Sequence, residues 1–151
     1  MTKTSTAGRG DGGWFEDGAD RGRVLISGAN TEGRWSLMEW VLAPDPAPVG
    51  HGAHLHRACE ESFLIRRGSL EFLLGDGVTT LNAGDFITVP PGARHGDANV
   101  SGAPVEMLVG FHPAGLEELF VKYRTDRGAQ AEDEGFMAEA TRLHASEFEP
   151  S

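Results

Sequence analysis

Hydrophobic residues in this chain occur mostly in short runs that are separated by turn-forming residues. The clearest run is the segment VEMLVGF at residues 105–111, in which every second residue is apolar and shares one face of an extended chain. Similar runs cover residues 23–27, 34–42, 53–57, 61–66, 70–74, 78–81 and 86–89. Short apolar runs with turns between them predict an all-β sandwich or barrel with a strand in each segment.

The segment RWSLMEWVL at residues 34–42 differs from the others because both of its faces are apolar. One face carries Met38, Trp40 and Leu42, and the other carries Trp35, Leu37 and Val41. A strand with one solvated face alternates between apolar and polar residues, so we expect this strand to be covered on both sides.

Turn signals mark the ends of the predicted strands. Residues 75–77, Gly-Asp-Gly, favour a hairpin, and the segment 43–52 is a loop because it holds three prolines. Gly68, Gly84 and Gly92 lie where tight turns require a positive φ, which glycine adopts without a steric cost.

Helical periodicity is confined to the C-terminal part of the chain. In residues 114–124, apolar side chains recur at helical spacing after Pro113, and a second helix is predicted from about 131 to 145. We expect these helices to pack on the outside of the barrel or against a partner subunit. Residues 1–13 are polar and predict a disordered arm, followed by a single domain over 14–151 whose helical extension starts at about 114.

Composition narrows the range of partners. The chain has 151 residues, enough for one core, and its 21 glycines suit a fold with many turns. A formal net charge of −10 disfavours nucleic acid and anionic membranes as partners. The one cysteine, Cys59, excludes an internal disulfide. Without a signal peptide or a membrane-length apolar run, we expect a soluble cytoplasmic protein that binds a small molecule.

Histidine and glutamate residues form the main chemical candidate. His54 and His56 are two residues apart, so both imidazoles face the same side of a strand. Glu61 joins them only if a turn or bulge within residues 57–60 changes the face. His95 must come from a different strand alongside. Three imidazoles and one carboxylate converging in a barrel make a transition-metal site, whereas isolated surface histidines in loops are the alternative.

Two segments around these residues carry a resemblance to a known family. HLHRACEESFLIRRG reads H-x-H, four residues, E, six residues, G, and GDFITVPPGARHGDAN reads G, five residues, P-x-G, two residues, H, three residues, N. They resemble the two conserved motifs of the cupin superfamily over roughly the middle half of the chain. The first motif departs at its opening glycine, where Pro48 stands. Glu60 is a rival to Glu61, but the six-residue gap to Gly68 favours Glu61.

The resemblance implies a cupin jelly-roll barrel, a homodimer and one divalent transition metal per chain. The metal ligands that it implies are His54, His56, Glu61 and His95. Imidazole and carboxylate ligands suit Fe, Mn, Ni, Co, Cu or Zn, so the metal remains open. Four ligands fill a tetrahedral zinc site, whereas an octahedral metal keeps two positions free. Glu61 is also the candidate catalytic residue, since a carboxylate that leaves the metal can act as a general base.

The substrate pocket is predicted to be mostly apolar. Its candidate residues are Trp40, Phe63, Ile65, Met107, Val109 and Phe111. Plain core packing is the alternative interpretation of each. Since no arginine is placed to bind a phosphate or carboxylate, an aromatic or polyketide-like substrate is favoured over a sugar phosphate.

Other polar residues receive smaller roles. Asp97 and Asn99 follow His95 at strand spacing and are predicted to orient its ring. Cys59 is predicted to pack in the core. His51 is predicted to lie in a loop and His144 on a helix surface, and His112 to have a structural role.

Three functions compete. The motifs and the segment FHPAGLEELF resemble small cupins of the quercetin-dioxygenase-like group, which implies a metal-dependent dioxygenase acting on an aromatic, enol or polyketide-like molecule. A non-oxidative polyketide cyclase, isomerase or lyase that uses the metal as a Lewis acid is the alternative. A small-molecule-binding module without turnover is the third.

Overall fold

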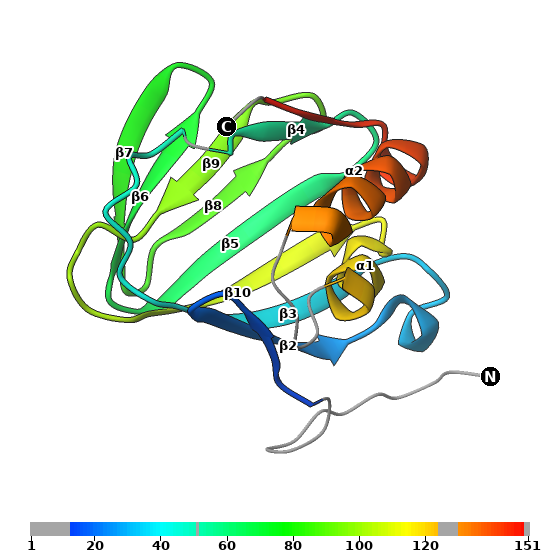
Figure 1. The fold of residues 1–151 in the computed structure, drawn as a ribbon, viewed down its shortest axis with the longest axis horizontal. Coiled ribbons are helices and arrows are strands. Elements are labelled where there is room, and N and C mark those ends of the chain that lie inside the picture. Colours follow the sequence, from blue (N-terminus) through cyan, green and yellow to red (C-terminus); the bar gives the residue numbers. More distant parts are fainter. Residues whose placement is uncertain (1–12, 51, 124–129, 150–151) are drawn as a thin grey trace.

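The computed structural model describes residues 13–50, 52–123 and 130–149, and these form two antiparallel sheets (Figure 1). The six-stranded sheet contains, in spatial order, β1 (Phe15–Asp17), β2 (Asp20–Ile26), β3 (Ser36–Leu42), β10 (Val105–His112), β5 (Glu60–Arg67) and β8 (Phe86–Val89). The five-stranded sheet contains β11 (Ser146–Phe148), β4 (His54–His56), β9 (His95–Ala98), β6 (Ser69–Leu74) and β7 (Gly77–Asn82). The predicted all-β jelly-roll is therefore confirmed.

Strand β10 forms the middle of the larger sheet, paired with β3 on one side and β5 on the other. Its alternating apolar residues, Val105, Met107, Val109 and Phe111, are all buried, as the sequence pattern predicts. They pack against the inner face of the smaller sheet, where Leu70 and Phe72 of β6 are fully buried. Period-two patterning thus defines the core between the sheets.

Strand β3 is fully covered on one face only, which corrects the prediction for residues 34–42. Trp40 is buried in the core, but on the other face Leu37 and Val41 are half-buried and Trp35 is 40% exposed. Between the two half-buried residues, the carboxylate of Glu39 binds Arg23 at 2.7 Å. An ion pair therefore covers part of the outer face that was expected to pack against apolar groups.

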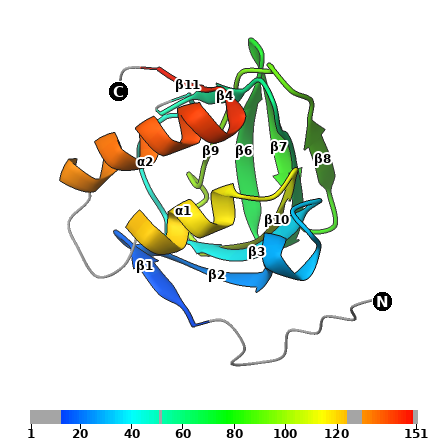
Figure 2. The same ribbon diagram turned by 90° about the vertical axis from the view of Figure 1, so that its right-hand side faces the viewer.

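Two helices, α1 (Leu116–Tyr123) and α2 (Gln130–His144), lie in front of the space between the sheets (Figure 2). A short 3-10 helix, η1 (Gly28–Asn30), precedes β3. The buried carboxylate of Glu117 accepts hydrogen bonds from the Gly28 backbone N–H at 2.7 Å and the Ser36 hydroxyl at 2.8 Å, which fixes α1 against β3. Phe136 of α2 joins the core, so the helices close one side of the barrel rather than only decorating its outside.

Two short strands of three residues each, β1 and β11, have no counterpart in the sequence prediction, which expected His95 to lie on a separate strand but gave that strand, the four-residue β9, no bounds. The sequences of β1 and β11 show little apolar alternation, and pairing with β2 and β4, respectively, keeps them extended. The positive φ predicted at Gly68, Gly84 and Gly92 is found at all three. The predicted arm, apart from Gly13, and His51 lie outside the described residues. Within the described part of the chain, no helix has the length and apolar character to cross a membrane.

Candidate metal centre and its cavities

The two sheets together bring the predicted ligand residues to one place. His54 and His56 lie on β4, and His95 lies on the neighbouring β9, directly opposite His54 in the register. Glu61 comes from β5 in the other sheet. The candidate ligand atoms of these four residues all lie within 4.8 Å of one another. The group therefore joins the two sheets across the inside of the barrel.

The turn between β4 and β5 explains why Glu61, and not Glu60, faces inward. Strand β4 ends at His56, and a turn at residues 57–58 carries the chain into the other sheet, as the change of face requires. Glu61 is 6% exposed and faces the histidines. Glu60 is exposed on the outer face, where its carboxylate accepts a hydrogen bond from Thr88.

A glycine turn places His95 beside β4. Gly92 has a φ of 82° and donates its backbone N–H to the carbonyl of His56 at 2.8 Å. This bond fastens the Pro-Pro-Gly turn of residues 90–92 onto β4. The chain then continues as β9, which starts at His95 and pairs with β6 on its far side. A residue with a side chain would be strained at this φ, which accounts for the glycine in the second motif.

Each of the three imidazoles has its Nδ1 facing an oxygen of the chain. Nδ1 lies 3.1 Å from the Gly52 carbonyl in His54, 2.6 Å from the Ser146 hydroxyl in His56, and 3.0 Å from the Ala93 carbonyl in His95. A ring that donates through Nδ1–H leaves the Nε2 lone pair free for a metal, and such partners orient ligand histidines in metalloproteins.

The opposite ring nitrogens converge on Glu61. Its Oε2 atom lies 2.8 Å from Nε2 of His95 and 3.4 Å from Nε2 of His56. Transition metals bind imidazole nitrogen and carboxylate oxygen at about 2.0–2.2 Å, so donor atoms around one ion lie roughly 3–4 Å apart. The spacing of this group and its donor types therefore fit a divalent transition metal.

Burial and neighbouring charges shift the pKa of three of these groups. Burial lowers the pKa of His54 to about 4, and His95 adds to this effect, so His54 is neutral at neutral pH. Burial acts to raise the pKa of Glu61, but hydrogen bonds with His56 and His95 hold it below its usual range. Burial acts to lower the pKa of His95, but the bond to Glu61 raises it. A neutral His54 and an ionised Glu61 suit metal binding.

Two cavities meet at this group. The barrel cavity, of about 190 Å³, lies between the sheets and is lined by Asp17, Asp20, Trp40, Leu42, His54, Glu61, Phe63, Phe72, His95, Gly96, Asp97, Met107, Val109, Phe111 and Phe120. The helix-side cavity, of about 340 Å³, is lined by Gly52, His54, His56, Glu61, Phe111, Leu116, Phe120, Phe136, Met137, Phe148 and Glu149. Both are predominantly apolar, and both reach His54 and Glu61.

Most of the predicted pocket residues line the barrel cavity, namely Trp40, Phe63, Met107, Val109 and Phe111. Ile65 does not: it is 1% exposed and packs in the core. Alternation along β5 correctly placed Ile65 on the same face as Phe63. It could not show that the cavity reaches Phe63 but does not extend to Ile65. Phe120 was overlooked as a cavity residue, although its place on the apolar stripe of the first predicted helix was a usable signal.

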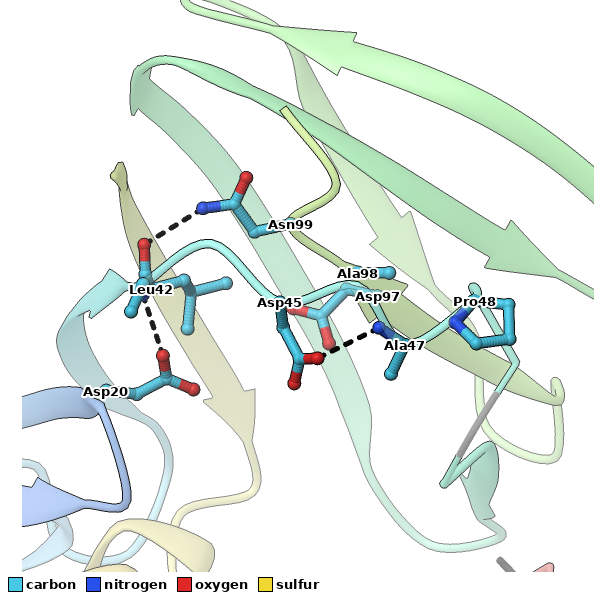
Figure 3. A pocket seen from close by; sticks show the side chains of 9 residues that line it. Asp20, Leu42, Asp45, Ala47, Pro48, Asp97, Ala98 and Asn99 are labelled. Atoms are coloured by element: carbon cyan, nitrogen blue, oxygen red, sulfur yellow. Dashed lines mark hydrogen bonds between the residues drawn. The ribbon is translucent and has the colours of Figure 1, made fainter. Parts of the chain in front are cut away.

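Asp97 and Asn99 do not orient His95, which corrects the prediction. The Nδ1 of His95 faces the Ala93 carbonyl instead. Asn99 donates its amide to the carbonyl of Leu42 at 3.0 Å (Figure 3) and to that of Ala103 at 2.8 Å, so it holds loops together. Asp97 lines the barrel cavity and also a neighbouring pocket. Burial, followed by the charge of Glu61, raises the pKa of Asp97 to about 6.

His112 and His144 do not belong to the ligand group, although the ring of His144 packs edge-on against that of His56, with the centroids 6.4 Å apart. His144 is 1% exposed, so its prediction as a helix-surface residue is wrong. Its Nε2 lies 3.3 Å from the Ala114 carbonyl, while Nδ1 has no hydrogen-bond partner among the described residues. His112 is exposed at the end of β10 and lines neither cavity.

Cys59 is buried in the core as predicted, and burial raises its thiol pKa to about 12.

Comparisons with known proteins support the fold. Residues 40–111 match the family model described as "Cupin domain". The structure is similar to KdgF from Halomonas sp., at 15% identity and a TM-score of 0.64 over 74% of this chain and 96% of that chain. An RmlC-like cupin from Shewanella frigidimarina has 19% identity and a TM-score of 0.59 over 76% and 96%.

A further similar structure is the polyketide cyclase RemF from Streptomyces resistomycificus. It has 23% identity and a TM-score of 0.59, and the match covers 72% of this chain and 79% of that chain. Comparison with curated proteins found no match. At these identities the similarity shows a shared fold, and the chemistry has to be argued from the residues of this chain.

Proposed function

This chain is a small member of the cupin superfamily, and from that premise we propose that it is a metal-dependent dioxygenase acting on an aromatic, enol or polyketide-like small molecule. One observation carries the proposal: three imidazoles and one carboxylate converge where two apolar cavities meet. His54, His56, Glu61 and His95 would hold the ion.

A redox-active divalent metal bound there would supply Lewis acidity and electron transfer to dioxygen. The residues of the chain provide the surroundings for that chemistry. Trp40, Phe63 and Met107 exclude water from the barrel cavity and favour a flat, apolar substrate body. Glu61 lines both cavities, so a proton taken up or released by its carboxylate is exchanged at the point where the two cavities meet.

A non-oxidative cyclase or isomerase is the second candidate. It is favoured by Asp97, a carboxyl group in the barrel cavity that is separate from the four candidate ligands. A second carboxyl group can move protons on a substrate without dioxygen. The polyketide cyclase among the similar structures shares the fold on which such chemistry occurs.

The first test is elemental analysis of protein purified without chelator or nickel resin, followed by oxygen uptake assays. The dioxygenase proposal predicts iron, manganese, copper, nickel or cobalt near one per chain, and oxygen consumption with a flavonol or catechol. Mass spectrometry should find both oxygen atoms of labelled dioxygen in the product. Zinc near one per chain, with product formed under nitrogen, would favour the cyclase. Tight binding without turnover would support a binding module.

The oligomeric state is a separate proposal. We propose a homodimer, on the family resemblance alone. Light scattering on the eluting protein distinguishes a dimer from the 16.1 kDa monomer.

A further inference from the structure

One carboxylate in the barrel cavity is not accounted for by metal binding. Asp97 follows His95 by two residues on β9, so both side chains face the inside of the barrel. The two Cα atoms are separated by roughly 7 Å, the rise of two strand residues. The register places Asp97 opposite Phe72 of β6, whose ring also lines the cavity. The barrel cavity thus has the candidate metal ligands at one end and a free carboxylate further along the same strand.

We propose that Asp97 determines substrate specificity by accepting a hydrogen bond from a hydroxyl or amine group of the substrate. The preferred substrate is then a neutral or cationic molecule, with an apolar body and a donor group placed a short distance from its metal-binding end. Substrates that carry a carboxylate or phosphate at this position are rejected. The inference rests on the proposed function, since it assumes that the barrel cavity receives the substrate.

Two neighbouring carboxylates accept hydrogen bonds from other residues, whereas among the described residues Asp97 has only its own backbone N–H as a donor. Asp20 accepts the backbone N–H of Ala43 at 2.7 Å, and Asp45 accepts that of Ala47 at 2.9 Å (Figure 3). Among the described residues, no other residue donates a hydrogen bond to the Asp97 side chain or forms an ion pair with it. A half-buried carboxylate without a donor from another residue has lost part of its hydration, so a donor on a ligand would be favoured there.

The charges around the cavity exclude an anionic group at the same place. Asp20 lines this end of the barrel cavity together with Asp97, and no lysine or arginine is among the described residues that line it. The nearby Arg94 points away and binds Glu149 and the Gly75 carbonyl. A substrate carboxylate or phosphate would lose water and meet like charges without a compensating cation. A hydroxyl or ammonium group would gain a charge-assisted hydrogen bond instead.

The test compares three catechols that share one chelating end and differ only in the tail: dopamine (amine), hydroxytyrosol (hydroxyl) and dihydroxyphenylacetate (carboxylate). Their affinities for the metal-loaded full chain are measured by calorimetry under nitrogen. We expect the amine and the hydroxyl compounds to bind about 10-fold or more tightly than the carboxylate, which is the effect of one hydrogen bond to a charged group.

Asp97→Asn should reduce this preference to about 3-fold or less, because the amide no longer repels the carboxylate tail. Asp45→Asn is the matched control: Asp45 lines the neighbouring pocket but not the barrel cavity, so its change should leave the preference intact. Metal content near one per chain in all three proteins verifies that the centre is unchanged.

The outcomes separate the two proposals. Equal binding of the three catechols by the wild-type protein, or an unchanged preference in Asp97→Asn, overturns the role of Asp97 and leaves the proposed function standing. If metal-loaded wild-type protein binds none of the catechols, this inference is overturned, and metal content and oxygen uptake decide the proposed function separately.

Discussion

The two ends of the barrel cavity hold the same kind of group, but the pKa values of the two groups are shifted in opposite directions. Glu61 and Asp97 are carboxyl groups removed from most solvent, and burial acts to raise the pKa of both. At the histidine end, bonds to two imidazoles hold the pKa of Glu61 below its usual range. At the acidic end, Asp97 has no such partner and its pKa rises to about 6. Hydrogen-bonding partners therefore decide in which direction the pKa of such an acid is shifted.

The strand arrangement explains why the partners differ. Glu61 projects from β5 towards β4 and β9 of the opposite sheet, where the histidines lie. Asp97 lies on β9 two residues after His95, near Asp20 and opposite Phe72 of β6. Two residues along β9 thus separate a carboxylate surrounded by histidines from a carboxylate that lies near another acidic residue.

Removing His95 should have the largest effect on the difference between the histidine end and the acidic end of the cavity. His95→Ala deletes one candidate ligand and a hydrogen-bond partner of Glu61, so metal content should fall from near one per chain to below about a tenth. The barrel should remain folded, as judged by circular dichroism. His112→Ala removes an exposed histidine outside both cavities and should bind metal normally. Unchanged metal content in His95→Ala would remove His95 from the site.

Exchanging the carboxylate at the histidine end is the next test. Glu61→Gln keeps the shape but loses the charge, and metal affinity measured by competition with a chromophoric chelator should fall about 100-fold. Glu60→Gln changes the adjacent residue, which points outward to Thr88, and should have no effect. Equal losses in both variants would show that general charge, and not ligation, controls affinity.

Ser146 offers a smaller perturbation of the same end. It is buried on β11 and lies 2.6 Å from Nδ1 of His56, so Ser146→Ala leaves the ring without its partner. Metal affinity should fall about 10-fold, and the visible spectrum of the cobalt-loaded protein should change as His56 reorients. Ser62→Ala removes a hydroxyl that pairs with Thr88 on the outer face and serves as the control. A cobalt spectrum identical to wild type would contradict this role.

The acidic end should show a weak effect on stability. Burial raises the pKa of Asp20, with Asp17 and Asp45 adding to it, so the folded protein binds a proton more tightly than the unfolded chain does. Stability from this group is therefore present at low pH and lost as pH rises through the folded pKa. Asp20→Asn, which keeps an acceptor for Ala43, should resist urea better than wild type at pH 8 but not at pH 4. Equal midpoints at both values would contradict the expectation.

Much of the fold follows from local patterns. Alternation along residues 105–111 predicted the inward face of β10, and the turn glycines predicted positive φ at Gly68 and Gly92. Strand β11 and the bounds of β9 escaped prediction, because three or four residues are too few to show a usable period. Both strands are extended because β4 and β6 supply partners for their backbone groups.

By itself, the sequence determined which residue types can meet: the H-x-H spacing, the change of face before Glu61 and the glycine turn before His95 are local properties of the chain. Tertiary structure alone decided what supports and surrounds them. Ser146 reaches His56 from 90 residues away, and the described strands and loops around Asp97 bring no donor from another residue to its carboxylate. The reason is physical: periodicity sets the face of a side chain, but hydrogen bonding and charge depend on neighbours that only the packed sheets bring together.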